Sequence, residues 1–145
     1  LSWELGWLLL HKQMPELENT PWAYVWWAYI DGGDYRYATA PIELVSMEIL
    51  SVANGCIGVA GLVLWRRSNG SDKRAVMLFM ATAIVHLYST AHYYLTELLE
   101  GLPNVDTTSF IDTWIKFGLA NAPWLTMPWL VLWWGAKHLR SDQVD

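Results

Sequence analysis

Long apolar stretches alternate with short charged segments along the chain. Among Asp, Glu, Lys and Arg, residues 44–64 contain only Glu48, whereas residues 75–96 and 117–136 contain none of the four. A helix of about 20 residues, at ~1.5 Å per residue, crosses the ~30 Å hydrocarbon core of a bilayer. The pattern therefore predicts three complete transmembrane helices, with approximate bounds 43–65, 75–97 and 116–137.

The opening segment is also apolar, apart from Glu4, but it is too short to cross a membrane. Ten helical residues reach only ~15 Å, about half of the hydrocarbon core. We therefore interpret residues 1–11 as part of a span, in a chain that starts at Leu rather than Met and lacks its N-terminal helix. The expected fold class is all-α, a polytopic transmembrane helix bundle that forms one domain over residues 1–145.

Composition narrows the functional classes. Hydrophobic residues make up 54% of the chain and charged residues 16%, compared with about 25% charged residues in soluble domains. The single cysteine, Cys56, excludes an internal disulfide and a thiolate metal site. A net charge of -5 disfavours binding to nucleic acid. We expect a protein of the lipid bilayer with no metal and no cofactor.

The distribution of lysine and arginine predicts the orientation of the spans. Basic residues concentrate in residues 66–74 and 137–140, which places both segments and the C-terminus in the cytoplasm. The only glycosylation sequon begins at Asn69, inside the first of these segments, so we expect it to remain unmodified. The aromatic connection between residues 11 and 43 suits the headgroup region, and we expect a short interfacial helix near residues 21–29.

Glu48 is the residue most indicative of chemistry, because a charged group within a span costs about 3 kcal/mol on insertion scales. Snorkelling of its carboxylate to the interface is one interpretation. The other is a carboxyl group that faces the bundle interior and transfers protons. Ser51 lies one turn further on the same helical face, and Glu4 in the first segment invites the same two interpretations.

Two further spans carry polar and aromatic candidates. His86, Thr90 and Tyr93 are separated by four and three residues, so they form a polar stripe on one helical face. For His86, packing against a neighbouring helix and a role in a cavity are equally open. Asn121 and Trp124 lie one turn apart, and a tryptophan face in a dry cavity stabilises a cation by ~2 kcal/mol. Together these residues predict a lipid-sized cavity with proton-transfer groups.

Three blocks of sequence carry a resemblance to a known family. The blocks are Tyr29 to Glu48 with Asp34, Arg36 and Tyr37, Leu87-Tyr88 to Tyr93-Tyr94-Leu95-Thr96-Glu97, and Asn121-Ala122-Pro123-Trp124 to Ala136-Lys137-His138-Leu139. In this order they resemble the emopamil-binding protein family, the EXPERA-domain proteins that include sterol Δ8-Δ7 isomerases. The opening Glu4-Leu5-Gly6-Trp7 is similar to the end of the family's second helix.

The resemblance implies a five-helix bundle and an isomerase that shifts a sterol double bond from Δ8 to Δ7. The double bond is protonated, a tertiary carbocation forms, and a second proton leaves from C7. By resemblance Glu48 and Glu4 are the catalytic carboxyl groups. The implied substrate-binding and cation-stabilising residues are Trp124, Asn121, Ser51, Tyr37, His86 and Thr90.

The resemblance also implies partners and a location. The ligands would be a sterol or another polycyclic lipid, together with cationic amines that mimic the carbocation, and a homodimer is left open. The membrane would be the endoplasmic reticulum in a eukaryote and the inner membrane in a bacterium. His86, Thr90 and Trp3 depart from the family's usual residues, and the place of its catalytic histidine precedes the first residue.

Two alternatives to the isomerase remain. One is a non-catalytic sterol- or amine-binding EXPERA protein, similar to the sigma-2 receptor. The other is a membrane terpene cyclase, because acid-initiated carbocation chemistry in an aromatic cavity needs similar residues. A purely structural bundle would leave Glu4 and Glu48 unexplained.

Overall fold

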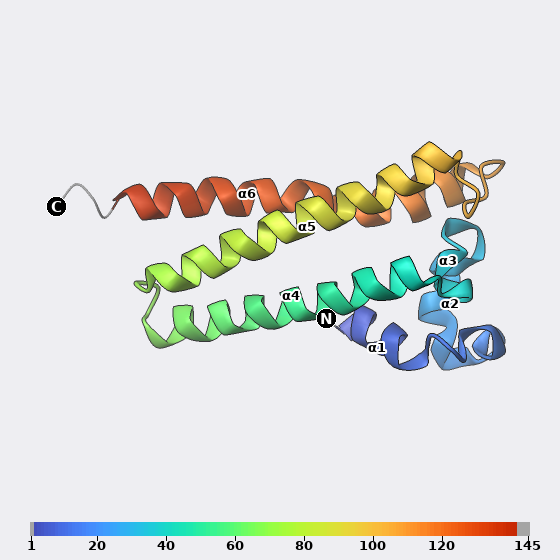
Figure 1. Ribbon diagram of the computed structural model, residues 1–145, viewed down its shortest axis with the longest axis horizontal. Coiled ribbons are helices and arrows are strands. Elements are labelled where there is room, and N and C mark those ends of the chain that lie inside the picture. The colour runs from blue at the N-terminus through green and yellow to red at the C-terminus, as the bar shows by residue number, and fades with distance from the viewer. Residues whose placement is uncertain (1, 142–145) are drawn as a thin grey trace.

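Three long helices run the length of the molecule (Figure 1). The computed structural model describes residues 2–141, and all regular elements in this range are helical. They include α4 (Ile42–Arg67), α5 (Lys73–Glu100) and α6 (Ala120–Ser141). Helix α5 packs against both α4 and α6, so the three form the frame on which the shorter elements lie.

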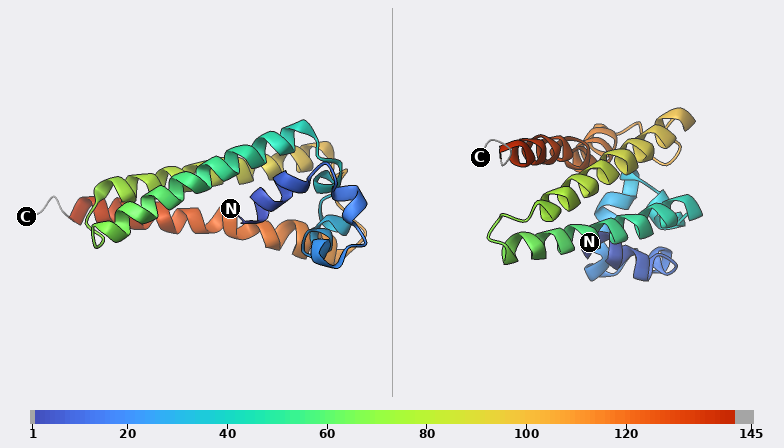
Figure 2. Two further views of the ribbon diagram at one scale, coloured as in Figure 1. Left: turned by 90° about the horizontal axis from the view of Figure 1, so that it is seen from below. Right: turned by 60° about the vertical axis from the view of Figure 1, so that its left-hand side comes forward.

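The shorter elements gather at one end of this frame, and α1 (Ser2–Leu10) lies against part of α4 (Figures 1 and 2). The connection from α1 to α4 contains η1 (Met14–Leu17), η2 (Pro21–Ala23), α2 (Tyr24–Gly33) and α3 (Arg36–Thr39). The short helix expected near residues 21–29 is therefore confirmed. The fully buried side chains of Trp7, Met14 and Ile30 belong to these elements, so the best-packed core lies at this end.

The ends of the long helices follow from local sequence. Pro41 precedes α4 as its N-cap residue in an extended conformation. At the start of α5 the Asp72 side chain accepts a hydrogen bond from the Arg74 backbone N–H at 2.9 Å, which satisfies one of the unpaired donors of the first turn. Gly101 ends α5 at φ +84°, a left-handed conformation that glycine adopts without strain.

The helix expected at 116–137 is preceded by a different element. Residues Ile111–Leu119 form the π-helix η3, which joins α6 at Ala120. Helix α6 then continues through Pro123 and Pro128 although neither has a backbone N–H to donate. The chain thus reaches Asn121 through a wider helix than the apolar pattern predicted.

The kink at the end of α2 lets the connection approach η3 closely. Gly32 has φ +75°, and a Cβ atom on it would lie 2.6 Å from Cγ of Asp112. The Lys116 Nζ donates to the Asp31 carbonyl at 2.5 Å and pairs with Asp112 at 2.6 Å. Glycine at this kink is therefore required both by its backbone angle and by the space.

Two helices are long and apolar enough to cross a membrane within the part of the chain that is described, namely α4 with 26 residues and α5 with 28. Their outer faces expose large apolar side chains such as Leu50 and Ile84. Helix α6 has 22 residues, but its tryptophans, prolines and Asn121 lower its hydropathy. Its crossing of the membrane, and with it a single domain over residues 1–145, stays a prediction.

Candidate functional site

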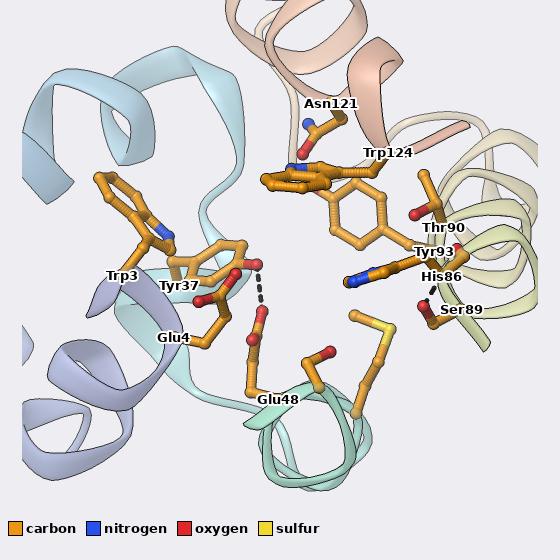
Figure 3. Close-up of a pocket in the computed structure, with 12 residues that line it drawn as sticks. Trp3, Glu4, Tyr37, Glu48, His86, Ser89, Thr90, Tyr93, Asn121 and Trp124 are labelled. Atoms are coloured by element: carbon orange, nitrogen blue, oxygen red, sulfur yellow. Dashed lines mark hydrogen bonds between the residues drawn. The ribbon is translucent and has the colours of Figure 1, made fainter. Parts of the chain in front are cut away.

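Side chains from five helices line a polar pocket of about 100 Å³ beside the N-terminal half of α4 (Figure 3). We call it the central pocket. Its lining residues are Trp3, Glu4, Tyr37, Met47, Glu48, Ser51, His86, Ser89, Thr90, Tyr93, Asn121 and Trp124. All eight site residues expected from the sequence are among them. The structure therefore brings the candidate residues together, whereas their chemical roles remain proposals.

The two candidate carboxyl groups enter the central pocket from different helices. Glu48, on α4, is only 4% exposed, and the Tyr37 hydroxyl donates to its Oε1 at 2.5 Å. Its other oxygen, Oε2, is buried and has no hydrogen-bond partner among the described residues. Glu4 comes from α1, and Figure 3 shows both carboxyl groups close to the Tyr37 hydroxyl. Glu48 thus faces the bundle interior and does not snorkel.

An imidazole and an indole form the opposite side of the pocket. The His86 and Trp124 rings stack with their centroids 5.5 Å apart and their planes at 20°. Trp124 is 50% exposed, so the fully dry setting expected for it is not found within the described residues. Thr90 is buried one turn after His86, as the polar stripe predicted.

A hydrogen-bonded chain leads from the pocket into the connection between α1 and α4. Asn121 donates through Nδ2 to the Tyr29 hydroxyl at 2.9 Å and to the Phe117 carbonyl at 2.8 Å. The hydroxyl groups of Tyr29 and Tyr93 lie 2.6 Å apart, and the Tyr93 hydroxyl donates to Oδ2 of Asp34. Burial, followed by the negative charge of Asp34, raises the pKa of Tyr29 above its ordinary value.

This series of hydrogen bonds ends in a buried ionic cluster of Asp34, Arg36 and Glu97. Asp34 is 0% and Glu97 1% exposed. Arg36 contacts Asp34 at 2.7 Å and Glu97 at 3.1 Å, and its guanidinium lies 4.4 Å from the centre of the Tyr93 ring. Burial alone would lower the pKa of Arg36, but hydrogen bonds to Asp34 and the nearby negative charges raise it.

The central pocket is smaller than the lipid-sized cavity predicted from the sequence, because side chains from five helices converge on it. Two apolar grooves share lining residues with it. One, of about 440 Å³ between α5 and α6, shares His86 and Trp124 with the pocket. The other, of about 450 Å³ between α4 and α5, shares Met47, Ser51 and Ser89. A lipid could therefore place one part in the polar pocket and the rest along an apolar groove.

Several residues of the site were not expected from the sequence. Tyr93 was recognised in the polar stripe but not as a lining residue, and Ser89 lies one turn from His86 on α5. Tyr29 and Asp34 come from the irregular connection, where helical periodicity gives no signal. Within residues 2–141, no three His, Cys, Asp or Glu side chains gather in a way that could hold a metal ion.

The fold and the pocket define a helical membrane protein in which two carboxyl groups, the buried Glu48 and the half-buried Glu4, line one polar pocket. The sequence model of the EXPERA (expanded EBP) superfamily matches residues 21–135, and the chain belongs to this superfamily. The family resemblance and the all-α membrane bundle predicted from the sequence are confirmed.

Two mammalian enzymes are similar to the chain over most of its length. The mouse 3-beta-hydroxysteroid-Delta(8),Delta(7)-isomerase is 27% identical over 139 residues, which cover 95% of this chain and 59% of the mouse protein. The rat enzyme of the same name is 24% identical over 139 residues, with the same coverage. The chain therefore spans a little over half the length of these relatives.

Proposed function

We propose that this protein is a membrane-embedded isomerase that moves a double bond of a sterol, or of a related polycyclic lipid, from Δ8 to Δ7. The observation that carries the proposal is the buried pair of Glu48 and Tyr37 in a pocket that shares His86 and Trp124 with an apolar groove. The similarity to two enzymes named for this reaction supports it.

The reaction needs one proton donor and one proton acceptor on a single bound lipid. A carboxyl group gives its proton to the Δ8 double bond, and the π electrons form the new C–H bond and leave a tertiary carbocation. A carboxylate then removes a proton from C7, and the electrons of that C–H bond form the Δ7 double bond. Glu48 and Glu4 lie in the same pocket and supply these two groups.

The other lining residues provide an environment suited to positive charge. The Trp124 ring offers its π face, and the charge of a carboxylate within the pocket attracts a carbocation. Ser51, Tyr37, His86, Thr90 and Asn121 hold the lipid and the carboxyl groups in position. This reaction needs no cofactor, because the lipid gains one proton and loses one proton and is neither oxidised nor reduced.

A second candidate function is binding of a sterol or a cationic amine without turnover. It is favoured by Glu48 Oε2, which is buried and lacks a hydrogen-bond partner in the described part of the chain. Such an oxygen suits the N–H of a protonated amine, because the ion pair would satisfy it. Binding without any Δ7 product would identify this function.

We further propose that the protein lies in the endoplasmic reticulum of a eukaryote, or in the inner membrane of a bacterium, with its C-terminus in the cytoplasm. The basic segments at 66–74 and 137–140 support this orientation, because both lie at the same end of the long helices (Figure 1).

Expression in yeast that lacks its own sterol Δ8-Δ7 isomerase tests the proposal. We expect the protein to convert Δ8 sterols to Δ7 sterols, and Glu48→Gln to abolish the conversion at an equal membrane level. Glu100→Gln is the matched control, because Glu100 is exposed at the end of α5, outside the central pocket. Unchanged Δ8 sterols with well-expressed protein would contradict the isomerase.

A further inference from the structure

The hydrogen-bonded chain that joins the ionic cluster to Asn121 has a defined direction. It runs from Asp34 through the hydroxyl groups of Tyr93 and Tyr29 to the side-chain amide of Asn121. A hydroxyl group has a single hydrogen to donate, so the donor at one end of such a chain determines the donors along the rest.

The direction is set at Asp34. Both of its oxygens accept hydrogen bonds from Arg36, at 2.7 to 3.2 Å, and the ion pair compensates the buried negative charge. A carboxylate in this state offers only acceptors, so the Tyr93 hydroxyl must donate to it. The Tyr93 oxygen then accepts from the Tyr29 hydroxyl, which therefore has no hydrogen left for Asn121.

The amide of Asn121 is consequently held in one of its two orientations. Its NH₂ group must face Tyr29, which can only accept, and the Phe117 carbonyl requires the same NH₂ group independently. The amide oxygen is left on the opposite side. Figure 3 shows this oxygen on the side of the Trp124 indole, which also lines the central pocket.

This orientation matters for a site where positive charge develops. An amide oxygen carries a partial negative charge and accepts hydrogen bonds, so it favours a cation, whereas the NH₂ group would repel one. Asn121 precedes Trp124 by one helical turn, and both line the pocket. An oxygen fixed beforehand stabilises charge without reorganising during the reaction.

We propose that Asp34 and Tyr29 are positioning residues, which fix the Asn121 amide with its oxygen toward the central pocket and thereby favour positively charged ligands and intermediates. Neither residue lines the pocket, so each acts through a neighbour. The effect on turnover rests on the isomerase function proposed above, but the orientation of the amide does not.

Nuclear magnetic resonance of the side-chain amides tests the orientation directly. The full chain is purified in detergent micelles with isotope-labelled asparagine, and Asn121→Ala identifies the Asn121 signal. We expect Tyr29→Phe to shift this signal and to speed its hydrogen exchange about fivefold, the effect of one typical net hydrogen bond. Tyr24→Phe, an exposed change on the same helix, should leave it unchanged.

Asp34→Asn extends the test to a residue that does not touch Asn121. The new amide can donate a hydrogen bond to the Tyr93 hydroxyl. The donors and acceptors of the hydrogen bonds between residue 34 and Asn121 are then no longer fixed, which should shift the Asn121 signal. A change confined to general packing would instead affect many asparagine signals alike. If Asp34→Asn does not fold, Tyr29→Phe decides the outcome, and an unmoved Asn121 signal in that variant would overturn the proposal.

Turnover provides the second measurement. We expect Tyr29→Phe to lower kcat by about 10- to 100-fold with little change in KM, as for a misplaced group in a site. The double variant with Asn121→Ala should be no slower than Asn121→Ala alone, and additive losses would contradict the proposal. If the unmutated protein makes no Δ7 product, the isomerase function fails, while the amide signals still test the positioning.

Discussion

Replacement of Arg36 by an uncharged residue should destabilise the protein more than the same replacement of an exposed arginine. The guanidinium lies between Asp34 and Glu97, whose side chains are 0% and 1% exposed. Arg36→Leu keeps most of the apolar stem but leaves two buried carboxylates without their counter-ion. Each would have to be desolvated without compensation or take up a proton.

The remaining contacts set the magnitude. Removal of one partner from a buried ion pair costs about 3–5 kcal/mol. Asp34 keeps the Tyr93 hydroxyl, and Glu97 keeps the Asn104 side-chain amide at 2.7 Å, so we expect the lower end, ~3 kcal/mol. At ~3 °C per kcal/mol for a chain of this length, Tm should fall by ~10 °C.

Thermal unfolding of the purified protein in detergent measures this effect. Arg67→Leu is the matched control, because Arg67 is exposed at the end of α4 and should change Tm little. Adding Asp34→Asn and Glu97→Gln to Arg36→Leu removes the two carboxylates that have lost their counter-ion, and it should restore much of the lost Tm. A Tm for Arg36→Leu no lower than that of Arg67→Leu would refute the reasoning.

Three further predictions concern pH, backbone and topology. Burial raises the pKa of Tyr37 above 10, so the folded state keeps a proton that the unfolded state releases, and stability should fall as pH rises past 10. Tyr37→Phe should make this fall shallower by about 1.4 kcal/mol per pH unit in unfolding titrations, and an equal slope would count against it. Gly32→Ala should lower Tm more than Gly101→Ala, because both have positive φ but only Gly32 meets another residue, Asp112. Asn69 should carry no glycan after expression in mammalian cells, and a mass shift removed by a glycosidase would reverse the orientation.

Helical periodicity explains how much of the site could be predicted. Glu48 and Ser51 share one face of α4, and His86 and Thr90 share one face of α5, so a correct helix assignment already points each pair in one direction. The cost of a charge within a span left two interpretations of Glu48, snorkelling and an inward-facing carboxyl group, and its 4% exposure in the structure supports the second.

The features of the site that the sequence did not predict lie where helical periodicity does not apply. Asp34 and Tyr29 belong to a kinked connection whose path depends on contacts with η3, and no repeat in the sequence reports such contacts. The small size of the central pocket depends on how five helices converge, which the pattern of one helix cannot reveal. The π-helix η3 was not predicted, because a run of apolar residues looks the same whether the backbone hydrogen bonds join each residue to the fourth one, as in an α-helix, or to the fifth, as in a π-helix.

The π-helix η3 sets the rotational phase of α6. A π-helix bonds each residue to the fifth one along the chain and an α-helix to the fourth, so a change in the number of residues within Ile111–Leu119 would rotate Asn121 and Trp124 together about the axis of α6. The composition and length of α6 would be unchanged by that change. The number of residues that precede α6 is therefore as much a determinant of the site as the identity of the residues on it.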